Sequence, residues 1–348
     1  MRPDRLLLIR NDKLGDFMLA WPAFALLRQQ YPDTTLVALV PHYTSSMAEI
    51  CPSIDEIIID DQHDSNVPDA IHLSRKIRAA RIDTSVSFYS EFRTALALWL
   101  ARVPMRVAPA TKLAQLLHNK TFRQKRSASA KPEFEYNIDL ARYAVELIGD
   151  TPKPHPQPPY LEFEAGVVIG QRSRYCAEHG IDAKRQLVFI HAGSGGSAVN
   201  LSLDQFATIA AFIIDRTGAH IVLTAGPDEL ANAEQLAAML PAASYSIYHS
   251  IEGLITFTRF IGVCDVFISG STGPLHIAGA LNKPTIAFYP ARRSATSLRW
   301  QTLSEDSRRL AFMPARYSGD TDRLDIDVSE CTATIESFLH RQPAGFCR

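Results

Sequence analysis

Short aliphatic segments alternate along the first half of the chain with longer segments whose apolar residues recur every three or four positions. Buried strands and amphipathic helices produce these two patterns. The predicted strands are Leu6–Arg10, Thr35–Val40, Glu56–Ile59 and Thr84–Ser87. The predicted helices are Phe17–Tyr31, Thr44–Ile50 and Asp69–Ala80. Regular alternation of this kind indicates an α/β fold in which helices cover a parallel sheet.

The alternation restarts after Thr151–Tyr160, a proline-rich segment typical of an extended connector between domains. The strands predicted after it are Leu187–Ile190, His220–Ala225, Val266–Ile268 and Thr285–Phe288. The predicted helices are Gly166–His179, Leu203–Arg216, Leu230–Leu240, Ile251–Val263 and one that opens at Pro274. We therefore predict two domains, 1–155 and 156–330, whose parallel sheets face each other across a cleft. A last helix near Thr332–His340, within 331–348, is expected to return to the first domain.

Two small-residue loops follow predicted strands of the second half. In the first, Gly193, Ser194 and Ser197 come after strand Leu187–Ile190. In the second, Ser271, Thr272 and Gly273 lead into the helix at Pro274, where proline suits a first helical turn. A helix N-terminus presents free amides and a positive dipole end, so it favours an anion such as a diphosphate. A tight turn without a ligand is the alternative.

Composition is that of a soluble globular protein, with 46% hydrophobic and 21% charged residues in 348. The five cysteines are scattered and show no CxxC spacing, which favours a reducing compartment over a disulfide framework or a zinc site. The first ten residues contain too few apolar positions for a signal-peptide core, and no apolar run approaches the length of a membrane span. We expect a cytoplasmic protein.

The segment Phe92–Pro132 contains nine lysine and arginine residues and no acidic residue. They are Arg93, Arg102, Arg106, Lys112, Lys120, Arg123, Lys125, Arg126 and Lys131. Such a segment is either a solvated basic face or a site for an anionic partner, and its unbroken charge favours the second. Nucleic acid is disfavoured because the aromatic residues are not interleaved for base stacking. A phosphorylated sugar, a lipid headgroup or an anionic membrane surface near Ala95–Leu100 fits better.

Several segments together resemble glycosyltransferase family 9, the ADP-heptose:lipopolysaccharide heptosyltransferases. They are RNDKLGDFMLAWPAFALLRQQYP, FRTALALWL, EFEYNIDL, HAGSGG and DVFISGSTGPLHIAGALNKPTIAFYP, in the family's order along nearly the whole chain. The resemblance implies a GT-B fold, with the acceptor in the first Rossmann-like domain and an ADP-sugar in the second. It also implies transfer with inversion at the anomeric carbon, with no metal or other cofactor.

Site residues follow from the resemblance position by position. Asp16 matches the proposed base, with an N-cap role as its alternative and Asp12 as a second candidate. His276 matches the motif histidine, and it would contact a phosphate or simply pack locally. Glu229 would bind the ribose hydroxyls or remain a surface acid. The basic segment would hold a lipopolysaccharide core at the inner membrane, through Arg93, Arg123, Lys125 and Arg126.

The chain also departs from the family pattern. Many relatives have a Lys-x-Trp-Pro segment whose lysine reaches the diphosphate, and Val199–Ser202 stands there instead. The replacement cation would be one of Arg10, Arg292, Arg293 and Arg299. Without the lysine, another nucleotide sugar or an inactive sugar-nucleotide-binding protein stays an alternative. A Rossmann oxidoreductase would need a GxGxxG fingerprint, which neither half contains.

Overall fold

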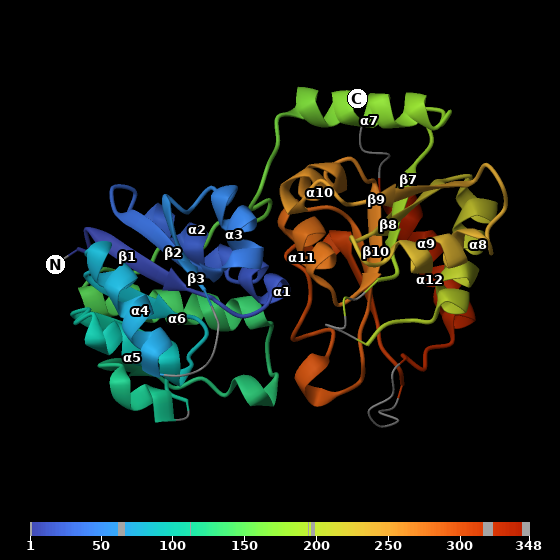
Figure 1. Ribbon diagram of the computed structural model, residues 1–348. Helices are drawn as coiled ribbons and strands as arrows, with labels where there is room; N and C mark the ends of the chain where they lie inside the picture. Colours follow the sequence, from blue (N-terminus) through green and yellow to red (C-terminus); the bar gives the residue numbers. More distant parts are fainter. Residues whose placement is uncertain are drawn as a thin grey trace. The chain divides into compact units, whose positions relative to one another are not determined.

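The computed structural model describes residues 2–61, 67–111, 113–193, 195, 199–315 and 323–342. The chain divides into two compact units, Met1–Tyr160 and Leu161–Arg348 (Figure 1). The boundary lies at the end of the predicted connector, five residues after the predicted one. Among the described residues, no helix is both long enough and apolar enough to span a bilayer.

The first unit contains a six-stranded parallel sheet in the order β3-β2-β1-β4-β5-β6. Its strands are β1 (Arg5–Ile9), β2 (Thr35–Pro41), β3 (Glu56–Asp60), β4 (Thr84–Ser87), β5 (Met105–Pro109) and β6 (Lys120–Phe122). The strand order reverses between β1 and β4, which makes their carboxyl ends the topological switch point. Ligands of open α/β sheets bind at such points, so this edge of the sheet is the first place to look for a site.

Helices cover the first sheet. They are α1 (Leu14–Met18), α2 (Trp21–Gln30), α3 (His42–Glu49), α4 (Val67–Ala79), α5 (Phe92–Leu100) and α6 (Glu133–Ile148), with 3₁₀ turns η1 (Leu113–Leu117) and η2 (Arg126–Ala128). Helices α4 and α5 pack on Leu7 and Ile9 of β1, whereas α2 packs against α6. The single helix predicted over Phe17–Tyr31 is broken, because Pro22 lacks an N–H and its ring would clash with the carbonyl of Met18.

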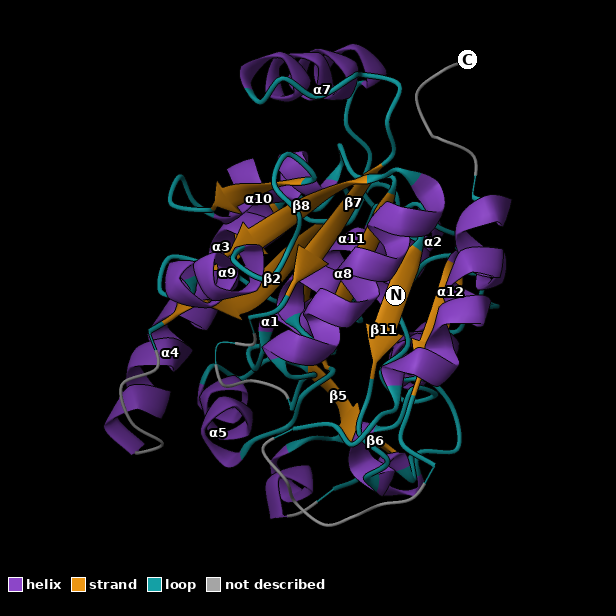
Figure 2. Cartoon of the chain, turned by 90° about the vertical axis from the view of Figure 1, so that its right-hand side faces the viewer, coloured by secondary structure: helices purple, strands orange, loops and turns teal. Residues whose placement is uncertain are grey.

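The second unit repeats this plan with a parallel sheet in the order β12-β11-β10-β7-β8-β9. Figure 2 labels three of its strands, β7, β8 and β11. Its strands are β7 (Leu187–His191), β8 (His220–Ala225), β9 (Tyr245–His249), β10 (Val266–Gly270), β11 (Thr285–Phe288) and β12 (Arg309–Phe312). Its helices are α7 (Ala165–Glu178), α8 (Leu203–Thr217), α9 (Leu230–Ala237), α10 (Leu254–Ile261), α11 (Gly273–Ala280) and α12 (Val328–Arg341), with 3₁₀ turns η3 (Arg293–Ala295) and η4 (Asp306–Arg308). Its switch point lies between β7 and β10.

The predicted return of the last helix to the first domain is wrong. Helix α12 packs on α8 and β12 of the second unit. Its apolar residues Cys331, Ile335 and Phe338 belong to the same buried cluster as Val188 and Ile190 of β7. A helix with one apolar stripe is stabilised by the core that covers that stripe, and here the second unit provides it.

Candidate active site

The loop after β1 carries Asp16 to the switch point of the first unit. The buried strand ends at Ile9, and Arg10, Asn11 and Asp12 follow before α1 begins at Leu14. Asp16 lies in the first turn of α1, whose N-cap residue is Lys13. The alternative of a capping role for Asp16 is therefore wrong. Its side chain is 14% exposed, so Asp16 is partly accessible to solvent.

Arg10 is the centre of a buried cluster of charges. Its Nε lies 2.8 Å from Oδ1 of Asp12, and its Nη2 donates a short hydrogen bond to Oδ1 of Asp16. Its Nη1 donates to the carbonyl of Phe88 at 3.1 Å, just beyond β4, and to Oε1 of Glu133 on α6 at 3.4 Å. One guanidinium thus joins the ends of β1 and β4 to α1 and α6. The side chain of Arg10 is 4% exposed.

The charges of this cluster do not balance. Glu133 also accepts a 2.6 Å hydrogen bond from Nη1 of Arg126, so two guanidinium groups face three carboxylates. Burial would lower the pKa of Arg10, but the three carboxylates raise it above its ordinary value. Burial raises the pKa of Asp12 to about 7, aided by the negative charge of Asp16 and opposed by Arg10.

The pKa of Asp16 is raised as well. Burial raises its pKa, Arg10 lowers it, the negative charge of Glu133 raises it further, and the exposed Lys13 lowers it. The net direction is upward. A carboxylate whose pKa is brought closer to neutrality is a better proton acceptor than an ordinary surface aspartate. The arrangement can therefore accept a proton from a hydroxyl group that reaches the partly exposed side chain of Asp16.

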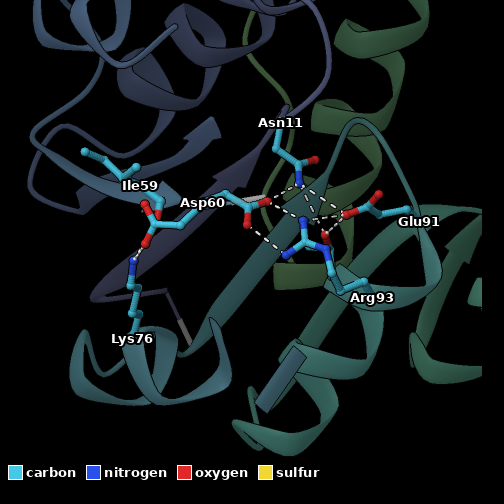
Figure 3. A network of polar contacts seen from close by, with 8 residues as sticks. Asn11, Ile59, Asp60, Lys76, Glu91 and Arg93 are labelled. Atoms are coloured by element: carbon cyan, nitrogen blue, oxygen red, sulfur yellow. Dashed lines mark hydrogen bonds and ion pairs between the residues drawn. The ribbon is translucent and has the colours of Figure 1, made fainter. Parts of the chain in front are cut away.

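A second network fixes the same loop from its other side (Figure 3). Nδ2 of Asn11 donates to Asp60 at 2.6 Å, at the end of β3. Arg93 of α5 donates to both carboxylate oxygens of Asp60, at 2.8 and 2.6 Å, and to Glu91 at 2.9 Å. Arg93 is buried, and its guanidinium forms ion pairs with these two carboxylates. Its predicted role as a contact for an anionic acceptor is therefore wrong, and it is a positioning residue.

The other predicted acceptor contacts lie in different environments. Arg126 is half-buried against Glu133, so it belongs to the Arg10 cluster. Arg123 and Lys125 are exposed. Lys112, another residue of the basic segment, lies outside the described residues. Arg123 and Lys125 are thus the two predicted acceptor contacts whose charged groups face solvent.

In the second unit, Glu229 fills the space beside the glycine loop. Its carboxylate accepts hydrogen bonds from the amides of Gly195 at 2.9 Å and Gly226 at 3.0 Å. A Cβ on Gly193 would lie 2.2 Å from that carboxylate, so Glu229 packs directly against this glycine. The Glu229 carboxylate thus accepts the hydrogen bond from the Gly195 amide that a bound phosphate would otherwise accept. Phosphate binding by this loop stays a prediction, and Ser194 and Ser197 lie outside the described residues.

Asn200 holds the loop after β7 against β10. Its amide donates to the carbonyl of Ala192 at 3.1 Å, and its side chain packs where a Cβ on Gly270 would lie, at 2.5 Å. Asn200 is one of the residues that replace the lysine-containing segment of the family pattern. It brings the carboxyl ends of β7 and β10 together at the switch point. Arg10 forms ion pairs with three carboxylates of the first unit, so it is a poor replacement for the lysine that would contact the diphosphate.

The α11 turn differs in detail from the prediction. The amide of Thr272 donates to the carbonyl of Gly270 at 2.8 Å, and its buried hydroxyl pairs with Ser269 at 3.1 Å. Thr272 thus shapes the turn and offers no group to a ligand, contrary to the prediction. The amides of Gly273 and Leu275 lie in the first turn of α11, where no intrahelical acceptor exists. Half-exposed Ser271 lies directly before this turn.

His276 is the fourth residue of α11 and is buried, with 2% of its surface exposed. Its Nδ1 has no hydrogen-bond partner among the described residues. Burial lowers the pKa of His276 to about 4, so the imidazole is neutral at physiological pH. A neutral imidazole can donate one hydrogen bond to an anion but adds no positive charge. The described residues contain no group of three His, Cys, Asp or Glu side chains placed to hold a metal ion.

Sequence reasoning missed Glu133, Asp60 and Asn200 as site residues. Glu133 begins the EFEYNIDL segment, so its position within a family motif was the available signal. Asp60 carries no such signal, because its partners Asn11 and Arg93 come from distant elements, and the packing of Asn200 against Gly270 is not visible in the sequence either.

Comparison with known proteins gives consistent matches. The model of glycosyltransferase family 9 (heptosyltransferase) matches residues 70–309. A Haemophilus influenzae protein named "Putative glycosyltransferase" is 41% identical over 337 residues, 97% of each chain. The structure of Escherichia coli ADP-heptose lipopolysaccharide heptosyltransferase II has a TM-score of 0.73 and 20% identity, covering 97% of this chain and 98% of that one. An E. coli heptosyltransferase solved with ADP has a TM-score of 0.69 and 17% identity, covering 96% and 99%.

The raised pKa of Asp12 predicts how stability depends on pH. Between about pH 4 and 7 the folded chain retains a proton on Asp12 that the unfolded chain releases, so stability falls as pH rises. Asp12→Asn should remove up to about 1.4 kcal/mol of this fall per pH unit. Urea unfolding at several pH values measures it, with exposed Asp33→Asn as the control. An unchanged slope in Asp12→Asn would show that Asp12 titrates normally.

Proposed function

Because the chain belongs to glycosyltransferase family 9 and is a glycosyltransferase with a two-domain GT-B fold, we propose that it transfers a heptose or related sugar from an ADP-sugar to a lipopolysaccharide core. The proposal includes inversion at the anomeric carbon without a metal ion. The observation that carries it is Asp16, whose partly exposed carboxylate is held by Arg10 at the β1/β4 switch point. The names of the heptosyltransferase relatives support the donor and acceptor classes.

Asp16 acts as the base in this proposal. It accepts the proton of the acceptor hydroxyl while the hydroxyl oxygen bonds to the anomeric carbon and the bond from that carbon to the diphosphate breaks. Its raised pKa favours proton acceptance. Asp12 would be protonated in part near neutral pH, since its pKa is about 7. Arg10 is a positioning residue, because it holds the carboxylate without contacting the sugar.

The start of α11 receives the leaving diphosphate. The amides of Gly273 and Leu275 and the positive end of the helix dipole stabilise the negative charge that develops on it. Ser271 and His276 supply further hydrogen-bond donors next to these amides. Glu229 is held by two backbone amides in the neighbouring loop, and one of its oxygens lies 3.5 Å from Nε2 of buried His191. A ribose hydroxyl would have to share this carboxylate with those groups.

Arg123 and Lys125 hold the anionic acceptor. Both are exposed, and they follow β6 in the acid-free segment of the first unit. Phosphate groups or carboxylates of a lipopolysaccharide core would pair with them. Arg126 does not join them, because its charge is paired with Glu133.

The donor is tested first by binding and then by turnover. Ligands that bind only the folded state raise the melting temperature, so a panel of ADP, UDP, GDP and CMP sugars should show its largest shift with an ADP-sugar. ADP-heptose and a truncated core acceptor should then give a glycosylated product by mass spectrometry. A larger shift and faster turnover with a sugar of another nucleotide would contradict the ADP-sugar donor while leaving the family assignment intact.

Asp16→Asn tests the base. The amide keeps the shape of the side chain but cannot accept the proton, so kcat should fall by about two to four orders of magnitude. The melting-temperature shift caused by the donor should persist. Asp204→Asn, which changes the first turn of α8, serves as a matched control and should leave kcat unchanged. A folded Asp16→Asn enzyme with near-wild-type turnover would exclude Asp16 as the base.

A further inference from the structure

Large apolar side chains are exposed in one region of the first unit. The described residues of this unit include eight large apolar side chains that face solvent, and six of them lie on α4, α5 and η1. These six are Val67, Ile71, Phe92, Trp99, Leu113 and Leu116. Helix α5 packs against both α4 and η1, so the three elements form one layer. We call these six side chains and their layer the α4–α5–η1 surface.

The spacing of these residues gives each element an apolar side. On α5, Phe92, half-exposed Leu96 and Trp99 are separated by four and then three residues, which places them along one stripe of the helix. On η1, Leu113 and Leu116 are three residues apart and therefore nearly superpose along the 3₁₀ axis. They are 75% and 79% exposed, more than any other large apolar side chain that the structure describes. The intervening Ala95, Ala97 and Leu98 are buried and hold α5 to the sheet.

The turn that exposes the two leucines is firmly held. Arg106 donates from Nε to the carbonyl of Leu117 at 2.9 Å and from Nη1 to the carbonyl of Val103. Nε2 of His118 lies 3.3 Å from Oγ of Ser90, just before α5. Ala114 is buried beneath the turn. Leu113 and Leu116 are thus displayed by a fixed backbone.

Positive charge accompanies these apolar side chains. Exposed Arg102 follows α5 and exposed Lys120 follows η1, within the segment that contains no acidic residue. Arg75 and Arg78 are exposed on α4, four and seven residues after Ile71. The carboxylates near these elements in sequence are Asp61, Asp64, Asp69, Asp83 and Glu91. Asp61 pairs with Lys76, Asp83 accepts from the amides of Asp4 and Arg5, and Glu91 accepts from Arg93 and Thr94. Apolar side chains flanked by basic ones are the pattern of a protein face that lies in the headgroup layer of an anionic membrane.

We propose that the α4–α5–η1 surface binds an anionic lipid bilayer, with Leu113, Leu116 and Trp99 inserted among the headgroups and the basic residues paired with lipid phosphates. A tryptophan is well suited to this depth, since its indole combines an apolar body with a polar N–H. A second copy of this chain fits less well. A two-fold dimer interface brings the same patch together twice, so it would oppose basic residues to basic residues. The proposal is independent of the donor and of catalysis.

Vesicle sedimentation tests the surface without any measurement of activity. The full chain should bind vesicles of phosphatidylcholine mixed with phosphatidylglycerol, bind phosphatidylcholine alone much more weakly, and dissociate as salt concentration rises. The double variant Leu113→Asp/Leu116→Asp should bind the anionic vesicles at least about tenfold more weakly, because two exposed leucines lose their burial in lipid. Ile251→Asp, a change at a 68% exposed residue of the second unit, should bind like the wild type.

Each other outcome overturns the proposal. Absence of wild-type binding, equal binding to both kinds of vesicle, or undiminished binding by the double variant would do so. A dimer seen by light scattering that the double variant abolishes, without vesicle binding, would assign the surface to self-association instead. Circular dichroism checks that the variants fold. Trp99→Ser provides a second variant that adds no charge, and it should also bind the anionic vesicles more weakly than the wild type.

Discussion

The guanidinium of Arg10 is the interaction on which the first unit's site depends. A buried charge is stabilised only when it is paired and hydrogen-bonded, and Arg10 has Asp12, Asp16 and Glu133 around it. These partners come from the β1 loop, α1 and α6. The carbonyl of Phe88 adds the end of β4. One side chain therefore fixes the switch point. Burial raises the pKa values of Asp12 and Asp16 there, Arg10 opposes the rise, and the neighbouring carboxylates add to it.

The second unit stabilises its switch point differently. There the loops after β7, β8 and β10 are joined by neutral amides and by Glu229. Glu229 accepts hydrogen bonds from two loop amides, whereas the amides of the first turn of α11 have no intrahelical acceptor. The same βαβ architecture thus carries a carboxylate in one unit and a helix start with free backbone amides in the other, where we propose that the diphosphate binds. These are the two functions that glycosyl transfer requires.

Much of the fold could be predicted from the sequence. Strands such as β1, β7, β8 and β10 are continuous buried apolar runs, and such runs are visible without a structure. The strands β5, β6, β9 and β12 were not predicted, because strands that are partly exposed mix polar and apolar residues. The last helix was assigned to the wrong unit, since an apolar stripe does not specify which core covers it.

The site was predictable only in part. The position of Asp16 at the end of the first strand follows from the order of elements, and its role stays a prediction. Arg93 was expected to meet an anion from outside, yet Asp60 and Glu91 already neutralise it. Gly193 was expected to admit a phosphate, yet it admits Glu229. Asp60 and Glu229 lie more than thirty residues from these positions, so local sequence does not reveal them, whereas Glu91 is only two residues from Arg93.

The central claim is that the charges around Arg10 set the proton affinity of Asp16. It is tested most directly by the pH dependence of kcat/KM in Glu133→Gln. Since the negative charge of Glu133 raises the pKa of Asp16, its removal should move the acidic limb of the profile to lower pH. Glu146→Gln, at an exposed position of the same helix, should leave the limb in place. A limb that stays unmoved or moves to higher pH in Glu133→Gln would contradict the account.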